Sequence, residues 1–163
     1  MNNARLSVQL INLDPGLKTI KLENEDFFKI ATVGGSRMTA YFKGDTIYRI
    51  TIWNGLSYGV SQYEYYLKNF RPFFIYETEE GYPEKDSAGS ADRTMLALNF
   101  EGKYYFDNRQ LIDRKIKGRK QLENETNDDQ SGSGSDQELK SLLANADSYV
   151  RILQARLKKI QAQ

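Results

Sequence analysis

Three stretches of this chain repeat one pattern, and the repeat limits the possible folds more than any other feature of the sequence. Each stretch has a tyrosine, then Phe or Leu, a polar residue, Gly or Asn, two variable residues and a second apolar segment; they span 41–48, 65–73 and 104–112. Aromatic segments joined by Gly or Asn are typical of β-hairpins, because these two residues tolerate the backbone angles of tight turns. The repeats predict three related hairpins in which Tyr41, Tyr66 and Tyr105 are equivalent.

The hairpins belong to a larger predicted sheet. Asn54-Gly55 is a strong turn signal between two of its strands. Because most strands follow their partner after a short turn, we expect an α+β fold with an antiparallel meander of about six strands. A short helix is expected over 3–13, where Leu6, Leu10 and Ile11 form one stripe and Val8 lies off it. A short strand is expected at 19–22, and the strands of the sheet proper at 38–43, 46–53, 60–68, 72–78, 94–106 and 110–117.

The hairpin turns can be built in two ways that differ in register. A two-residue loop at Gly44-Asp45 needs positive φ, and its equivalents would force that conformation on Phe70 and Arg109, where it is costly. We therefore expect three-residue loops. Because side chains alternate between the two faces of a sheet, this choice decides which residues face the core. The pairs that it predicts are Phe42 with Tyr48, Ala40 with Ile50, Leu67 with Phe73, Tyr65 with Ile75 and Phe106 with Ile112.

In that register one face of the sheet is apolar and the other mixes aromatic and charged side chains. Tyrosine and tryptophan offer a large contact area with little loss of conformational entropy. The mixed face is therefore a candidate exposed platform for a protein, peptide or glycan partner. The alternative is that these side chains only stabilise the sheet, through cross-strand pairs that contribute roughly 0.2–1 kcal/mol each. The candidate binding residues are Tyr41, Arg49, Trp53, Tyr66, Tyr76 and Tyr105.

The C-terminal part of the chain differs in composition from the hairpins. Residues 1–118 form the predicted sheet domain with its N-terminal helix, and 119–135 read as a flexible polar linker. Residues 136–163 predict an amphipathic helix, because Ser135 and Glu138 have capping-box spacing and apolar residues then form one stripe. We expect this helix to cover the apolar face of the sheet; pairing with another chain is the alternative.

Composition excludes several kinds of chemistry. The chain of 163 residues has no Cys and no His, so thiol nucleophiles, disulfides and histidine-dependent catalysis are excluded. The net charge is +1, which gives no overall field favouring nucleic acid or a membrane. We identify no catalytic, cofactor-binding or metal-binding residues and expect no cofactor.

Two groups of charged residues are candidate sites. A basic run near the last hairpin can contact anions, but acidic residues follow it at once, so we expect a solvated strand end and no nucleic-acid partner. Paired carboxylates near the polar loop at 79–92 can hydrolyse glycosides without histidine, but only where burial separates their pKa values, and we expect these to be exposed. The two groups are Arg109, Arg114, Lys115, Lys117, Arg119 and Lys120, and Glu77, Glu79, Glu80, Glu84 and Asp86.

The segment from Phe100 to Ile112, echoed by Glu64 to Asn69, resembles a recurring segment of small uncharacterised envelope proteins and lipoproteins from Bacteroidota. It is also similar to the variant MORN repeat, in which an aromatic pair precedes Asn-Gly and a Leu or Ile strand. The resemblance implies an exported protein of the cell envelope, periplasmic or associated with the outer membrane, with room for a lipid anchor outside the chain. It brings no enzymatic residues.

We therefore expect a non-catalytic envelope protein that acts as a binding or structural module through the exposed aromatic face. One alternative is a cytosolic protein-interaction module of the inhibitor or immunity type. A third hypothesis is a carboxylate-based hydrolase. The oligomeric state is left open by the sequence.

Overall fold

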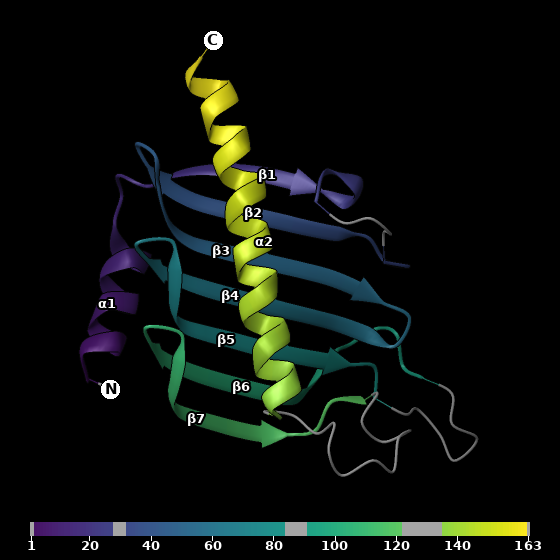
Figure 1. The fold of residues 1–163 in the computed structure, drawn as a ribbon. Helices are drawn as coiled ribbons and strands as arrows, with labels where there is room; N and C mark the ends of the chain where they lie inside the picture. Colours follow the sequence, from purple (N-terminus) through teal and green to yellow (C-terminus); the bar gives the residue numbers. More distant parts are fainter. Residues whose placement is uncertain (1, 28–31, 84–90, 122–134, 163) are drawn as a thin grey trace.

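The protein folds as one antiparallel sheet with a helix on each side (Figure 1). The structure, a computed structural model, describes residues 2–27, 32–83, 91–121 and 135–162. Seven strands lie side by side in chain order, so the expected meander is confirmed, with the short N-terminal strand as a full member. The elements are α1 (Asn2–Leu13), β1 (Lys18–Glu23), the 3-10 helix η1 (Asn24–Asp26), β2 (Ser36–Lys43), β3 (Thr46–Leu56), β4 (Gly59–Lys68), β5 (Arg71–Gly81), β6 (Ala97–Asp107), β7 (Gln110–Gly118) and α2 (Asp136–Gln161).

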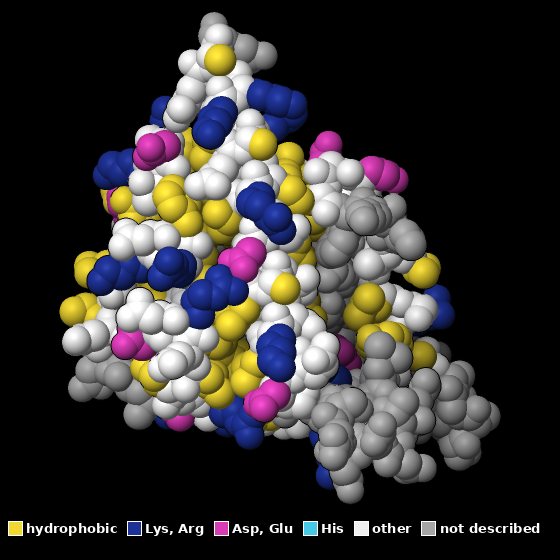
Figure 2. Space-filling view, viewed as in Figure 1, with side chains coloured by type: hydrophobic (Ala, Val, Ile, Leu, Met, Phe, Trp, Pro, Cys, Tyr) yellow, Lys and Arg dark blue, Asp and Glu magenta, His cyan; other side chains and the backbone are white. Residues whose placement is uncertain are grey.

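Helix α2 crosses one face of the sheet from the β7 side to the β1 side (Figure 1). Ser135 begins it, because its hydroxyl accepts a hydrogen bond from the Glu138 backbone N–H at 3.2 Å. The expected apolar stripe faces the sheet, and each fully buried aliphatic side chain contributes roughly 1.5–3 kcal/mol. Lys and Arg side chains lie along the outward side of α2 in Figure 2. The buried residues of α2 are Leu139, Leu142, Ala146, Tyr149, Val150, Leu153 and Leu157.

The three hairpin turns are two-residue loops, so the expected three-residue loops are wrong. Asn69 and Phe70 have φ of 50° and 62°, and Asn108 and Arg109 have φ of 46° and 71°. Positive φ costs an ordinary residue roughly 1–2 kcal/mol. Contacts of the side chains offset this cost: Phe70 packs against the core, and Arg109 forms a two-pronged ion pair with Asp147 of α2 at 2.7 and 2.8 Å.

A β-bulge follows each turn and restores the alternation of faces. The extra residues are Tyr48, Phe73 and Ile112, and none of them lies opposite Phe42, Leu67 or Phe106 as expected. Those positions are taken by Ile47, Pro72 and Leu111. Beyond the bulge the expected pairs Ala40 with Ile50 and Tyr65 with Ile75 do form. Each bulge therefore sends one apolar residue to the face opposite α2.

Asn54-Gly55 is not a turn but part of β3, and the loop to β4 lies three residues later, at Ser57-Tyr58. Gly55 is needed within the strand because the backbone of Gly34 packs directly on it: a Cβ on Gly55 would lie 2.7 Å from the Gly34 Cα. Two backbone hydrogen bonds hold this contact. Gly34 N–H donates to Gly55 O at 3.0 Å, and Gly55 N–H donates to Gly35 O at 2.9 Å. The glycine marks a close approach of two backbones.

Most of the linker expected at 119–135 lies outside the described residues, as do Glu84 and Asp86 of the polar loop. The described residues that flank the stretch 122–134, Gln121 and Ser135, lie near the same end of α2, because Lys120, which precedes Gln121, contacts Glu138 in the first turn of that helix.

We expect Leu153→Ala to lower the free energy of unfolding by roughly 2–5 kcal/mol, because Leu153 is 0% exposed on the side of α2 that faces the sheet. Ile160→Ala is the matched control on the same helix: Ile160 is 49% exposed, so its loss should be about 0.5 kcal/mol or less. Urea unfolding followed by Trp53 fluorescence measures both. Equal losses in the two variants would contradict the seating of α2 described above.

Candidate functional site

The face of the sheet opposite α2, here called the aromatic face, is organised in three rows that run across the strands. All six candidate binding residues lie in these rows, and Tyr41, Arg49, Tyr66 and Tyr105 share the third. From β2 to β7 the rows are Arg37, Trp53, Gln62, Thr78, Glu101 and Lys117; Thr39, Thr51, Glu64, Tyr76, Lys103 and Lys115; and Tyr41, Arg49, Tyr66, Phe74, Tyr105 and Asp113.

Helix α1 covers the middle of the third row. Tyr66, Phe74 and Tyr105 are buried, and Ala4, Val8 and Ile11 of α1 pack against them. The expectation of an exposed platform is therefore wrong for Tyr66 and Tyr105. The expected stripe of α1 is also wrong in part, since Val8 faces the sheet whereas Leu6 and Leu10 face solvent.

Arg49 joins the sheet to the end of α1. Its guanidinium forms an ion pair with Glu64 at 3.0 Å, donates to Asn12 Oδ1 at 3.0 Å and lies over the Tyr41 ring at 4.9 Å. The Tyr66 hydroxyl donates to Glu64 Oε2 at 2.7 Å. Burial, reinforced by this bond to a carboxylate, raises the pKa of Tyr66 to about 12. The Tyr66 hydroxyl also lies 3.1 Å from Asn12 Oδ1, so Arg49 and Tyr66 both tie the end of α1 to the sheet.

Trp53 and Tyr76 lie beyond α1 and are partly exposed. Arg37 lies over the Trp53 ring at 5.7 Å, and Lys103 lies over the Tyr76 ring at 5.3 Å. Glu101 accepts from the Tyr76 hydroxyl at 3.0 Å and pairs with Lys103 at 2.7 Å, which lowers the pKa of Glu101. We call the first and second rows the open half of the aromatic face.

The Tyr76 hydroxyl has a pKa raised to about 12 by burial and by its bond to Glu101. It is therefore a neutral hydrogen-bonding group at physiological pH. Together with Trp53 it gives the open half two aromatic side chains of fixed orientation among charged neighbours. Such a surface can bind a partner without first ordering its own side chains.

The acidic residues near the polar loop are not all exposed as expected. Glu77 is 2% exposed, and Glu79 is buried beside it on the α2 face. The Glu77 carboxylate pairs with Lys120 at 2.5 Å and accepts from the Tyr104 hydroxyl at 3.3 Å. Glu79 Oε1 accepts from the Gln121 backbone N–H at 2.6 Å. Residues that follow β7 thus hold both carboxylates.

Lys120 bridges two carboxylates, because it also pairs with Glu138 of α2. Burial works to lower the pKa of Lys120, but the two carboxylates outweigh it and the pKa is raised. Burial raises the pKa of Glu77 although Lys120 opposes the shift. The tyrosines beside Glu77, Tyr63 and Tyr104, have pKa values raised by burial and by the carboxylate charge. The bridge is a clamp between β5, the segment after β7 and α2.

More residues of the basic run form ion pairs than expected. Lys120 is partly buried between two carboxylates, Arg109 binds Asp147, and Lys117 lies 3.9 Å from Glu101. Only part of the run forms the solvated strand end that was expected, with Lys115 among its exposed members. Among the residues that the structure places, no group of three or more Asp and Glu side chains is arranged to hold a metal ion.

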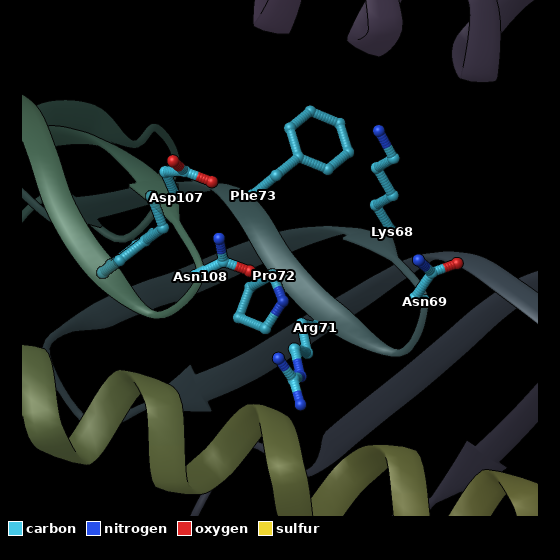
Figure 3. Close-up of a pocket in the computed structure, with 8 residues that line it drawn as sticks. Lys68, Asn69, Arg71, Pro72, Phe73, Asp107 and Asn108 are labelled. Carbon is cyan, nitrogen blue, oxygen red and sulfur yellow. The ribbon is translucent and has the colours of Figure 1, made fainter.

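A notch of about 580 Å³ separates the tips of the second and third hairpins (Figure 3). It exists because the pairing of β5 with β6 ends at Phe74 and Tyr105, so the two tips diverge. Figure 3 shows Lys68 and Phe73 pointing toward α1, Arg71 toward α2, and Asp107 on the opposite wall. The notch carries both signs of charge, from Lys68, Arg71 and Asp107.

Sequence reasoning missed Lys120, Tyr63 and Tyr104 as parts of one cluster. The apolar alternation of β4 and β6 places Tyr63 and Tyr104 on the α2 face, and Glu77 interrupts the same face of β5. A charged residue at a core-facing position was the available signal. No sequence signal indicates the position of Lys120, because that position depends on how α2 packs on the sheet.

Comparison with protein-family models, curated proteins and solved structures found no match to this chain. Within residues 2–27, 32–83, 91–121 and 135–162, no helix combines the length and apolar character needed to cross a bilayer.

Lys120→Met should lower the free energy of unfolding by roughly 3–5 kcal/mol, because it leaves Glu77 buried without its cation. Glu77→Gln should cost about 1.5 kcal/mol or less, since Lys120 keeps Glu138. Adding Glu77→Gln to Lys120→Met should recover most of the loss. Lys115→Met, at an exposed lysine, is the control in urea unfolding; a loss as large as that of Lys120→Met would refute the clamp.

The raised pKa of Glu77 fixes the sign of a pH effect. Between its ordinary pKa of 4.5 and its higher folded value, the folded state binds more protons than the unfolded state, so this contribution to stability grows as pH falls. Asp147, whose pKa Arg109 lowers, acts oppositely and only below its ordinary 3.8. As pH falls from 7 to 5, wild type should therefore gain stability relative to Glu77→Gln. Parallel stability curves for the two proteins would contradict this assignment.

Proposed function

We propose that this chain is a non-catalytic binding module and that a protein or peptide partner docks on the open half of the aromatic face. The observation that carries the proposal is the pair Trp53 and Tyr76, partly exposed and held in fixed orientation by Arg37, Lys103 and Glu101. Rigid aromatic side chains among charged neighbours are the kind of group that dominates binding energy at protein interfaces.

The charges of the open half favour a partner with carboxylates. At its β6–β7 end Lys103, Lys115 and Lys117 lie around the single carboxylate of Glu101 in adjacent rows. Lys117 has 82% of its side chain exposed, so it is available to an incoming anion. A partner that places acidic groups here and an apolar group on Trp53 would match the surface.

The compartment and the class of module rest on the sequence resemblance alone. On that basis we propose the cell envelope. The cytosolic inhibitor or immunity module remains the alternative, and it would use the same surface. Sequencing the 5′ end of the native gene distinguishes the two, because only the envelope protein needs an export leader.

Trp53 is the only tryptophan, so a chain labelled with 5-fluorotryptophan gives one ¹⁹F resonance that reports on the open half. A partner captured from extract of the native cells should shift or broaden this resonance when purified and added. It should bind the double variant Trp53→Ala with Tyr76→Ala at least about ten-fold more weakly, a loss of roughly 1.4 kcal/mol or more.

The matched control replaces Lys140 and Arg156, both exposed, with Ala on α2, across the sheet from the open half. This variant should bind like wild type. A partner that leaves the ¹⁹F resonance unchanged, or binds the aromatic double variant as tightly as wild type, would overturn the proposed docking surface.

The second candidate function is hydrolysis by carboxylates, favoured by the raised pKa of buried Glu77 between Tyr104 and Lys120. Glu77 does not line the notch between the hairpin tips. Chromogenic glycosides and esters test the idea, because Glu77→Gln should abolish any activity while its circular dichroism stays unchanged. Absence of turnover by wild type removes this candidate.

A further inference from the structure

Helix α1 is apolar on two opposite faces. Its inner face, Ala4, Val8 and Ile11, packs on the sheet. Its outer face carries three leucines that are among the most exposed large apolar side chains described: Leu6 at 56%, Leu10 at 63% and Leu13 at 78%. Figure 1 shows α1 beside the hairpin ends, clear of α2. A helix that is apolar on both faces is normally buried on both.

The outer leucines have the spacing of a helix-pairing seam. Steps of four and three residues separate Leu6, Leu10 and Leu13, and Asn3 precedes Leu6 by three, which continues the same 3–4 alternation. Leu6 and Leu13 lie almost symmetrically about Leu10. When two such helices run antiparallel, Leu10 packs against its own copy and Leu6 packs against Leu13. The stripe is thus complementary to itself, as an interface with two-fold symmetry requires.

The charges of α1 also fit a second copy. Arg5 is the only ionisable side chain of the helix, so bringing two copies together buries no carboxylate and sets no row of like charges face to face. Solvent-facing helices ordinarily carry many charged residues, which keeps them soluble. The outer face of α1 instead carries leucines flanked by amides.

The area is of the right order for a small interface. Ile112, a bulge residue that is 60% exposed, lines a groove of about 420 Å³ with Ala4 and Ser7 and widens the apolar surface beside α1. The three leucines and Ile112 expose on the order of 400 Å² per copy, a patch large enough to mark an interaction surface. With the flanking amides, two copies would bury about 1,200 Å² in total, where specific interfaces begin.

We propose that the outer face of α1 is the interface of a two-fold symmetric homodimer, in which α1 pairs antiparallel with α1 of a second copy. A second groove of about 480 Å³ runs along α1 and is lined by Leu10, Tyr48 and Phe73. It gives room for side chains of the second copy beside the leucine seam. This interface involves none of the residues of the open half, so the two surfaces can act independently.

Sedimentation equilibrium of the full chain tests the state of association. Wild type should sediment at twice the chain mass of 18.8 kDa, with a concentration-dependent fall to one chain on dilution. Leu10→Glu should sediment as one chain with unchanged circular dichroism, because Leu10 touches solvent in the monomer. Leu98→Glu, at an equally exposed leucine of β6, is the matched control and should remain a dimer.

Cross-linking tests the register, because the chain has no cysteine of its own. Leu10→Cys should form a disulfide with its own copy on mild oxidation, since the bond needs Cβ atoms about 3.5–4.5 Å apart. Leu6→Cys and Leu13→Cys should each cross-link poorly alone and efficiently when mixed. Leu6→Cys cross-linking to itself would show a parallel arrangement and overturn the proposal.

Further outcomes of these experiments would overturn the proposed dimer or its interface. Wild type that stays at one chain mass at about 100 μM overturns the dimer, and co-sedimentation of this monomer with phosphatidylglycerol vesicles would assign the leucines to lipid. A dimer that survives Leu10→Glu overturns α1 as the interface. If Leu10→Glu does not fold, Leu10→Ala replaces it, with at least a ten-fold weaker dimer expected.

Discussion

The structure depends on one requirement: the apolar face of the seven-stranded sheet must be shielded from water by a helix. A meander has two wide faces, and α2 supplies a single apolar stripe long enough to cross every strand. Three polar ties hold it along its length. Lys120 binds Glu138 in its first turn, Arg109 binds Asp147 near its middle, and Gln161 donates to the Gly44 carbonyl at its end. Two of these ties come from hairpin turns, so the turns and the helix fix each other.

That coupling explains which parts of the fold the sequence predicts. The alternation of apolar and polar residues and the spacing of the turns predict the meander. They also predict the strand pairs that lie beyond each bulge, such as Tyr65 with Ile75. They do not identify the bulges. The local cost of positive φ at Phe70 and Arg109 argues for longer loops, but in the folded protein Phe70 is packed and Arg109 is ion-paired to α2. Tertiary contacts therefore outweigh a correct local rule.

The candidate site shows the same limit in another form. Alternation assigns the six candidate residues to one face, but only the docking of α1 decides that Tyr66 and Tyr105 are buried while Trp53 and Tyr76 are not. Because α1 has apolar residues on opposite faces, its periodicity cannot say which stripe packs inward. Lys120 looks like one of several solvated lysines, and its burial follows from Glu77 and Glu138 lying on different elements.

The charged groups under α2 have partners within the chain, whereas the outer leucines of α1 have none among the described residues. This difference bears on function. The buried charges under α2 have partners: Glu77 has Lys120 and Tyr104, and Glu79 has a backbone N–H. Removing Lys120 would leave the buried Glu77 without its cation, which is what a structural cluster is expected to show. The leucines of α1 lie in solvent at the opposite side of the sheet, where no requirement of the monomer explains them. The buried charges therefore serve the fold of the single chain, and the exposed leucines fit the homodimer proposed above.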